Sequence, residues 1–396
     1  MVVARSLAFI VREHIKSINK FKIKTMKNSI KLLGLLLFLL AGNFNASACT
    51  GIRLIAKDGG VVYARTMEWG AFDLHSRVAL IPIGYNFTGL TPDGIIGKKF
   101  TVKYGIVALD MLGKDYIADG MNEKGLAVGL FYHPGYAKYP EYDKANAANC
   151  ISAQDLTTYI LSQFSSIEEV KAGMHKIIVV GVVEKAIDMV VDAHWMVTDN
   201  SGTSIVIEFT GGELKIHDAP LGVITNAPNY DWHITNLSNY LNLSMFSLEP
   251  RTLSGVKFAP TGAGSGMIGL PGDNTPPSRF VRAVTWTQSA RKIENAKEGI
   301  YEAFRILDNF NLPLGPDGAE GSGAGHNMDI MRSSTIWTTA WNLSDMTLNF
   351  HTQHNRRVRS INIKAIDFAK IGDEIVHITF DEKKEQDVLD ITPKFN

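Results

Sequence analysis

Cysteine is scarce in this sequence, which has two, Cys49 and Cys150, in 396 residues. Two cysteines can form at most one disulfide, so a disulfide framework cannot be what holds the chain together. A cysteine that acts as a nucleophile must also keep its thiol free. Because Cys49 is the candidate nucleophile, we predict that Cys150 is a free, partly buried thiol.

A long hydrophobic run is also missing. The most apolar stretch, from Leu32 to Ala41, is ten residues long, whereas a helix that crosses a bilayer needs roughly 20. The sequence therefore predicts no stable membrane insertion of the exported protein.

Net charge is absent, since 40 basic residues balance 40 acidic ones. The charges are unevenly placed along the chain. Residues 1–48 hold eight Lys or Arg and one Glu, which leaves 32 basic and 39 acidic residues, a net charge of −7, in the remainder. Proteins that bind nucleic acid need a basic face to neutralise phosphates. The acidic remainder argues against a nucleic-acid partner.

Signatures of metal and nucleotide cofactors are missing as well. The chain has no HExxH or CxxC motif, and the spacing of His351 and His354 in a predicted strand does not bring their rings together. The stretch Gly264–Gly269 fits G-x-G-x-x-G, but no strand precedes it and "LPGD" follows where a helix should begin. We predict neither a metal nor an organic cofactor. Three other histidines are interpreted as packed or turn residues: His194, His217 and His233.

What is present begins with a secretory signal peptide. Lys27 and Lys31 supply the basic stretch, residues 32–41 the apolar core, and Ala-Ser-Ala at 46–48 the cleavage site. A signal that starts at Met26 is complete by itself, which makes Met26 a candidate start. We expect residues 1–48 to be removed and the protein to be exported to the periplasm or the exterior of a bacterium.

Cleavage after Ala48 would make Cys49 the first residue. Lipoprotein signals also end just before a cysteine, which is then acylated. They usually place Leu three residues before the cysteine, and here that residue is Ala46. A non-catalytic binding lipoprotein anchored through Cys49 is therefore the alternative from another functional class.

The pattern of apolar residues predicts an α+β fold. Residues 50–56 and 61–69 flank "KDGG" and predict a β-hairpin, and residues 79–87, 101–111 and a turn followed by a strand at 118–133 continue the strands. Two helices with capping-box spacing are predicted at 152–164 and 165–177. A meander over 194–228, two helices within 278–312, and strands at 335–343, 346–353 and 357–363 follow.

Short turns join most of these strands, which predicts antiparallel sheets covered by helices instead of alternating βαβ units. No repeat or linker marks a boundary. We therefore predict a single domain over residues 49–396.

A cysteine at a chain terminus has distinctive chemistry. Its α-amine has an ordinary pKa near 8 and its thiol one of about 8.5, so the amine can take the thiol proton at neutral pH and the residue supplies both nucleophile and base. Arg65 would favour the thiolate by its charge, and Glu68 could hold the α-amine by a charge-assisted hydrogen bond. In an ideal strand a spacing of three places these two on opposite faces. The alternative reading of Cys49 is a buried structural cysteine.

Several motifs resemble, in order, the choloylglycine hydrolase family of conjugated bile salt hydrolases and penicillin V acylases. They are "CTGIRL", "ARTMEW", "ADGMNEKGL", "GVITNAPNYDWHITNLSNY" and "GLPGDNTPPSRFVR". The resemblance implies an N-terminal nucleophile hydrolase fold, a four-layer αββα sandwich of two antiparallel sheets. It also implies hydrolysis of linear amide bonds without a cofactor, commonly by a homotetramer.

The resemblance also implies roles for individual residues. The family nucleophile matches Cys49 and the catalytic arginine matches Arg65. The amine-binding aspartate falls on Glu68, a departure that keeps the charge but lengthens the side chain. The oxyanion asparagine matches Asn226, and the arginine of "SRF" matches Arg279. A side chain aimed at a developing oxyanion is typically worth about 3–4 kcal/mol.

Substrate-binding residues are expected at Met67 and in "GLFYHPG". A family position that is Asn in many bile salt hydrolases and Tyr in penicillin acylases falls on Phe131 or Tyr132, depending on a shift of one residue. The segment 70–80 is expected to line the pocket, and the segment 240–273 resembles an assembly loop of tetrameric members. Conjugated bile salts are the favoured substrates, with penicillin V and N-acyl homoserine lactones as alternatives.

Overall fold

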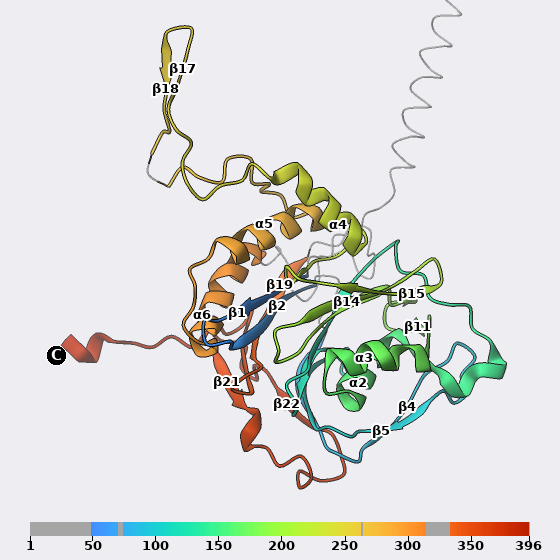
Figure 1. The fold of residues 1–396 in the computed structure, drawn as a ribbon. Helices are drawn as coiled ribbons and strands as arrows, with labels where there is room; N and C mark the ends of the chain where they lie inside the picture. The colour runs from blue at the N-terminus through green and yellow to red at the C-terminus, as the bar shows by residue number, and fades with distance from the viewer. Residues whose placement is uncertain (1–48, 70–73, 263, 314–332, 396) are drawn as a thin grey trace, which may run out of the picture. The chain divides into compact units, whose positions relative to one another are not determined.

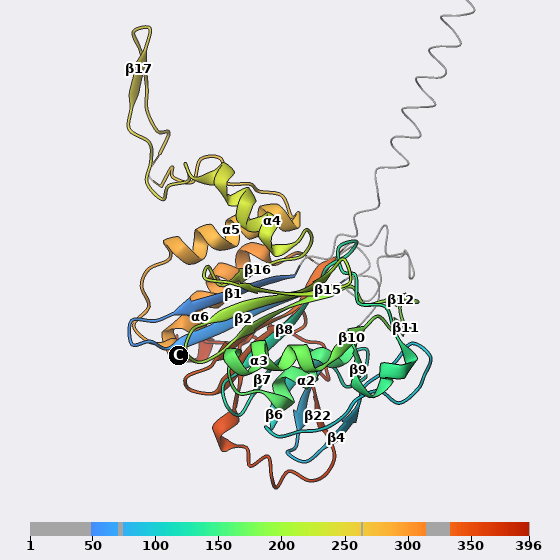
Figure 2. The same cartoon turned by 45° about the vertical axis from the view of Figure 1, so that its right-hand side comes forward.

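The structure is a computed structural model that describes residues 49–69, 74–262, 264–313 and 333–395, all within one compact unit. The predicted signal peptide, residues 1–48, lies outside the described residues. Two large antiparallel sheets stack face to face, and helices cover their outer faces (Figures 1 and 2). The predicted α+β sandwich of four layers is confirmed.

The first sheet has six strands and carries the start of the described chain. Its order is β16-β1-β2-β19-β20-β21, and every neighbouring pair is antiparallel. Its strands are β1 (Thr50–Ile55), β2 (Val61–Trp69), β16 (Val223–Ile224), β19 (Ser334–Asn342), β20 (Thr347–Thr352) and β21 (Arg359–Asn362). The predicted hairpin of residues 50–69 is therefore β1–β2, and β16 adds the segment before Asn226 beside β1.

The second sheet has eight strands in the order β15-β14-β13-β8-β7-β6-β3-β22, again with antiparallel neighbours. Its strands are β3 (Arg77–Ile81), β6 (Ile106–Met111), β7 (Tyr116–Asn122), β8 (Ala127–Tyr132), β13 (Ala193–Thr198), β14 (Ser204–Thr210), β15 (Glu213–Asp218) and β22 (Val376–Thr379).

Smaller elements complete the fold. Pairs of short strands are formed by β4 (Asn86–Thr88) with β5 (Lys99–Thr101), β9 (Cys150–Ser152) with β10 (Ile178–Val180), β11 (Val183–Glu184) with β12 (Met189–Val190), and β17 (Arg251–Leu253) with β18 (Val256–Phe258). The α-helices are α2 (Ala153–Gln163), α3 (Ile167–Gly173), α4 (Tyr230–Asn236), α5 (Pro276–Ser289) and α6 (Ala296–Leu307).

The helices begin where the sequence supplies caps. Ser152 and Asp155 form the predicted capping box of α2, and Ser166 caps α3. Helices α5 and α6 pack on the six-stranded sheet through β1, β2 and β19, whereas α2 packs on β7 and β8 of the other sheet. Figure 1 shows α5 and α6 in orange on one outer face and α2 and α3 in green on the other.

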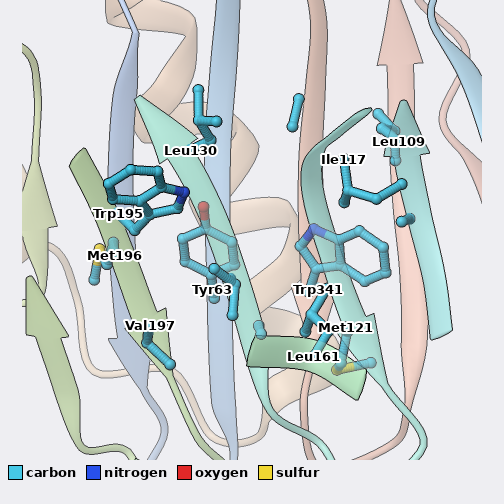
Figure 3. Packing of buried hydrophobic residues seen from close by; sticks show 14 of the residues in the cluster. Tyr63, Leu109, Ile117, Met121, Leu130, Leu161, Trp195, Met196, Val197 and Trp341 are labelled. Atoms are coloured by element: carbon cyan, nitrogen blue, oxygen red, sulfur yellow. The ribbon is translucent and has the colours of Figure 1, made fainter. Parts of the chain in front are cut away.

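The core fills the space between the two sheets. All nine residues of β2 and of β19 are buried, as are all six of β6 and β8, because central strands of a four-layer sandwich have cover on both faces. Figure 3 shows Tyr63 of β2 and Trp341 of β19 packed among residues of the second sheet, including Leu130 and Trp195. This rigid interior supports the residues around Cys49.

Several predicted elements differ in detail. The strands predicted at 79–87 and 101–111 are shorter or divided, since β3 ends at Ile81, β4 begins at Asn86 and β6 begins at Ile106. The stretch 118–133 was predicted to begin with a turn, but residues 118–122 belong to β7, and the turn comes after Asn122. The pattern there contains Gly and Asn, which favour turns, but burial between sheet neighbours β6 and β8 overrides that preference. Strand β22 was not predicted at all. Its four residues, Val-His-Ile-Thr, alternate apolar and polar, but the strand is short and all four are exposed at the sheet edge.

Candidate active site

Cys49 lies immediately before β1, where the six-stranded sheet meets the core. Its side chain is 2% exposed, and its backbone N donates a hydrogen bond to Asn226 Oδ1 over 3.0 Å. Its Sγ lies 3.8 Å from Met67 Sδ on the neighbouring strand β2. Strand pairing therefore brings Cys49 together with Met67 and Asn226, two of the site residues expected from the sequence.

Arg65 lies on the same face of β2 as Met67 and points into the space between the sheets. Its Nη1 donates to the carbonyl oxygens of Ala118, over 3.0 Å, and of Leu130, over 2.5 Å. Its guanidinium carbon lies 4.2 Å from the centroid of the Phe131 ring. These contacts hold a fully buried cation close to the Cys49 thiol.

Glu68 occupies the opposite face of β2, as its spacing from Arg65 requires. Its Oε1 accepts a hydrogen bond from Thr335 Oγ1 over 3.0 Å, and its Oε2 has no hydrogen-bond partner among the described residues. Burial raises the pKa of Glu68 to about 7, although Thr66 and Arg279 oppose the rise. The hydrogen bond from Cys49 N goes to Asn226, not to Glu68.

Asn226 and Arg279 hold the main chain at Cys49. Arg279, on α5, donates from Nη1 to the Cys49 carbonyl and to Thr50 Oγ1, and from Nη2 to Asn226 Oδ1 over 2.6 Å. The Oδ1 atom thus accepts from two donors, which fixes the orientation of the amide. One N–H of Asn226 Nδ2 donates to Tyr132 O over 2.6 Å. A side-chain amide has two N–H groups, and this bond uses one of them.

The charges around Cys49 act in opposite directions. Burial raises the pKa of the thiol, whereas Arg65 and, more weakly, Arg279 lower it. Burial also lowers the pKa of Arg279 to about 10. The thiol is therefore a poor nucleophile until a nearby base removes its proton.

A cavity of about 60 Å³ opens beside the thiol. Tyr132 and Met67 line it together with Cys49, while Phe131 is not among its lining residues and packs under Arg65 instead. Of the two positions left open by the sequence, Tyr132 is therefore the one that faces the cavity. Trp69 and Leu74 also line it, and residues 70–73 between them, which belong to the segment expected to line the pocket, lie outside the described residues. Leu130, on β8 with Tyr132, also lines it. The remaining lining residues come from three further segments: Met111, Leu112, Tyr116, Gln154, Ile187, Met189 and Val191.

A buried cluster of histidines around Glu208 contacts the backbone at Thr225 and Asn226. His194 Nδ1 is 3.1 Å from Glu208 Oε1, and its Nε2 is 3.0 Å from the carbonyl oxygen of Thr225. His233 Nε2 is 2.9 Å from the Asn226 carbonyl oxygen. Sequence reasoning missed Glu208, since nothing in "SIVIEF" distinguishes a buried carboxylate from an exposed one.

The geometry of this cluster does not suit a metal ion. The rings of His133 and His194 are parallel within 1°, with centroids 4.2 Å apart. Because imidazole lone pairs lie in the ring plane, those of two stacked rings do not converge on one ion at the usual bond length of about 2 Å. Burial and the neighbouring His194 lower the pKa of His133 to about 3. The cluster is a hydrogen-bonded support for the Thr225–Asn226 backbone.

A second group of possible ligands, Asp110, Asp115 and His377, is accounted for by ion pairing. Arg77 Nη2 lies 2.5 Å from Asp110 Oδ2, and His377 Nε2 lies 2.8 Å from Asp115 Oδ1. This network joins β22 to β3 and β6.

Cys150 is not among the residues that line the cavity, and the structure shows both cysteines as free thiols. Cys150 is fully buried, somewhat deeper than predicted, because β9 pairs with β10 beneath α2. Among the described residues, no helix combines the length and apolarity that crossing a bilayer requires.

Comparison with known proteins places this geometry in a family. The sequence model of the linear amide C–N hydrolases, choloylglycine hydrolase family, matches residues 49–379. A bile salt hydrolase/transferase from Clostridium perfringens is 30% identical over 317 residues, which cover 80% of this chain and 92% of that protein. A penicillin V acylase from Pectobacterium atrosepticum is 25% identical over 374 residues, which cover 88% and 89%.

Solved structures agree. A variant of the conjugated bile acid hydrolase from Clostridium perfringens superimposes with a TM-score of 0.74 at 27% identity, over 87% of this chain and all of the other. Penicillin V acylase from Agrobacterium tumefaciens gives a TM-score of 0.65 at 25% identity, over 84% and 91%. The match of the family model over most of the sequence confirms the resemblance, and the chain therefore belongs to the choloylglycine hydrolase family and is a hydrolase of linear amide C–N bonds other than peptide bonds.

Proposed function

We propose that this protein is an exported hydrolase of conjugated bile salts in which Cys49, freed at its amine by removal of residues 1–48, is the nucleophile. The observation that carries the proposal is the position of Cys49. Its thiol lines an apolar cavity, while its backbone N bonds to Asn226 and its carbonyl bonds to Arg279. The family match also begins at residue 49.

The bonding of the Cys49 nitrogen supports activation by cleavage. While residue 48 is attached, this nitrogen is a peptide N–H, which can donate to Asn226 Oδ1 but cannot accept a proton. Once freed, it is an amine with an ordinary pKa near 8. It can then take the proton from the buried thiol, which burial otherwise holds in the neutral form.

The first half of the reaction is attack by the Cys49 thiolate on the amide carbonyl carbon. As the C–S bond forms, the carbonyl oxygen becomes an oxyanion, and the second N–H of Asn226, which is not the one bonded to Tyr132 O, is the proposed donor to it. The ammonium of Cys49 protonates the leaving amine as the C–N bond breaks, which leaves a thioester.

The second half is hydrolysis of that thioester. The amine of Cys49 takes a proton from water, the hydroxide attacks the acyl carbon, and the C–S bond breaks to release the acid. Arg65 stabilises the departing thiolate by charge. Glu68 contributes negative charge near the new ammonium, and Arg279 fixes Asn226.

Bile salts are favoured because the relatives at about 30% identity carry that name and because the cavity lining is largely apolar. Penicillin V is the second candidate, and the specific observation for it is Tyr132. The family position that is Tyr in penicillin acylases falls on this residue if Tyr132 and not Phe131 is its counterpart, and Tyr132 is the one that lines the cavity. N-acyl homoserine lactones share the amide and form the third class to be tested.

We also propose that the protein assembles as a homotetramer through the segment 240–273. Figure 1 shows its hairpin β17–β18 extending from the sandwich. Both strands are exposed along their whole length, and exposed apolar residues of this density mark interaction surfaces: Leu241, Phe246, Leu253, Val256 and Phe258. Light scattering behind size-exclusion chromatography measures the assembly, and a monomer at micromolar concentration would refute it.

The test of the function compares protein that starts at Cys49 with the full chain that retains residues 1–48. Released taurine, glycine or penicillin nucleus is quantified with taurocholate, glycocholate and penicillin V. We expect turnover of the bile salts by the protein that starts at Cys49 and none by the full chain or by Cys49→Ala. Cys150→Ala is the matched control and should keep its activity.

Three results would overturn parts of this proposal. Full turnover by Cys49→Ser or by the uncleaved chain would refute the role of the freed cysteine. Faster turnover of penicillin V than of the bile salts would show that penicillin V is the preferred substrate. An intact mass above that of residues 49–396 by the mass of a lipid would show the acylated alternative and remove the free amine.

A further inference from the structure

The cavity beside Cys49 has one polar side-chain amide in an otherwise largely apolar wall. Met, Leu, Ile, Val and Trp side chains make up most of the lining, and among the described residues no Arg, Lys or His is part of it. Cys49, Tyr116 and Tyr132 add polar groups, and the side-chain amide is that of Gln154, the second residue of α2, which is 1% exposed. Buried carboxamide groups normally form hydrogen bonds, so the partners of this one have to be identified.

The orientation of this amide is set by one contact. Gln154 Nε2 donates to the carbonyl oxygen of Val182 over 3.2 Å. Because a carbonyl oxygen can only accept, the amide cannot be turned to place Oε1 there. The Oε1 atom is buried and has no hydrogen-bond partner among the described residues. It is therefore a buried acceptor without a partner, carried by a residue that lines the cavity.

We propose that Gln154 Oε1 accepts a hydrogen bond from a hydroxyl group on the acyl part of the substrate and so selects hydroxylated acyl groups. The inference rests on the proposed function of Cys49 as nucleophile and deepens it by naming a specificity residue. The acyl part is the partner because the described part of the lining holds no cation for the anionic glycine or taurine part of a conjugate.

This contact separates the candidate substrates. A bile acid carries ring hydroxyl groups, each of which can donate to Oε1. The phenoxyacetyl group of penicillin V has an ether oxygen and no donor, so binding it would leave Oε1 buried without a partner. A site built to hydrogen-bond a substrate group rejects an analogue that lacks it far more strongly than an apolar pocket rejects a change of shape.

The experiment measures kcat/KM for a series of taurine conjugates that differ by one substituent. It uses protein that starts at Cys49, with taurocholate, conjugates that lack the 7- or the 12-hydroxyl, conjugates with a ketone at either position, and the conjugate of unsubstituted cholanic acid. A ketone keeps the volume but turns a donor into an acceptor. For the hydroxyl that meets Gln154, we expect its removal or oxidation to lower kcat/KM by about 10-fold.

Two variants locate the effect. Gln154→Met keeps the length of the side chain but has no hydrogen-bond acceptor of comparable strength, and we expect it to reduce the preference to about 2-fold or less. Met189→Leu changes the apolar wall at similar volume and should keep the full preference, whatever its overall rate. Turnover of the unsubstituted conjugate by Gln154→Met shows that this variant is folded.

Each outcome decides the inference. A preference that is present in the wild type, lost in Gln154→Met and kept in Met189→Leu supports it. Wild-type protein that hydrolyses hydroxyl-free and ketone conjugates as well as taurocholate overturns it, as does an unchanged preference in Gln154→Met. In both cases bile-salt turnover still supports the proposed function. Absence of turnover with every conjugate refutes the proposed substrate and this inference with it.

Discussion

Replacement of Arg279 by Lys tests whether the guanidinium fixes the active-site backbone by its geometry or only by its charge. Arg279 contacts four acceptors from three nitrogens: Asn274 O, Cys49 O, Thr50 Oγ1 and Asn226 Oδ1. A Lys ammonium is a single centre with three donors and cannot span all of them. At least two hydrogen bonds from a charged donor are lost, each worth about 1.5–3 kcal/mol. We therefore expect the free energy of unfolding to fall by about 3–6 kcal/mol.

Activity should fall for a separate reason. Without the bond from Nη2, the Asn226 amide keeps only the bond that Oδ1 accepts from the Cys49 nitrogen and the bond that Nδ2 donates to Tyr132 O. In the proposed mechanism its second N–H is then held less firmly toward the developing oxyanion. Loss of one positioned oxyanion donor typically lowers kcat by about 10²–10³-fold. Urea unfolding measures the free energy of unfolding. The kcat on taurocholate is measured without urea, at a temperature where the variant is folded. A folded Arg279→Lys protein with wild-type kcat would refute the argument that hydrogen-bond geometry at Asn226 limits catalysis.

Three further predictions concern burial and packing. Burial raises the pKa of Glu68 to about 7 from an ordinary 4.5, so ionising this carboxyl group opposes folding of the wild type. The free energy of unfolding of Glu68→Gln, relative to wild type, should therefore rise by about 3 kcal/mol between pH 4.5 and 7. A difference in urea unfolding that does not depend on pH contradicts this. A Cβ at Gly129 would lie 1.9 Å from Tyr63 Oη, so Gly129→Ala should lose about 1–3 kcal/mol, part of which Tyr63→Phe should restore in the double mutant. Lys114 Nζ lies 2.5 Å from Glu184 Oε1, and this ion pair joins two segments that line the cavity. Lys114→Met should therefore raise KM more than it lowers kcat. An equal fall of kcat and kcat/KM would argue against a role of this ion pair in shaping the cavity.

Much of the fold follows from local sequence rules. The β1–β2 hairpin, the capped helix α2 and the antiparallel architecture were predictable because turn residues, capping residues and alternation each act over a few positions. Residues 118–122 show where such rules fail. Their Gly and Asn favour a turn, but pairing with strands far along the chain decides the structure, and no local signal contains that information.

In the candidate site, too, some features were predictable from local sequence rules and others were not. Arg65 and Glu68 were placed on opposite faces of a strand from their spacing, and the structure has them so. The choice between Phe131 and Tyr132 could not be made, since a shift of one residue exchanges the two faces of β8. Gln154 was missed because α2 carries a capping box but no catalytic or binding motif. Its importance comes from an unpaired acceptor in an apolar wall, which exists only after residues 111–116 and 182–191 are folded around it.

The supports of Asn226 show why its segment requires so many distant residues. Arg279 on α5 holds the side-chain oxygen, His233 on α4 holds the backbone carbonyl, and His194 on β13 holds the carbonyl of the preceding Thr225. Each partner comes from a different element, so the amide is fixed against rotation and its backbone against shifts. A preorganised donor stabilises an oxyanion without first reorganising. These supports are hydrogen bonds within a buried region, so in the proposed mechanism the donors that polarise the substrate amide are held by this chain's own side chains and main chain. The one group that changes between the inactive and the active state in that mechanism is the nitrogen of Cys49.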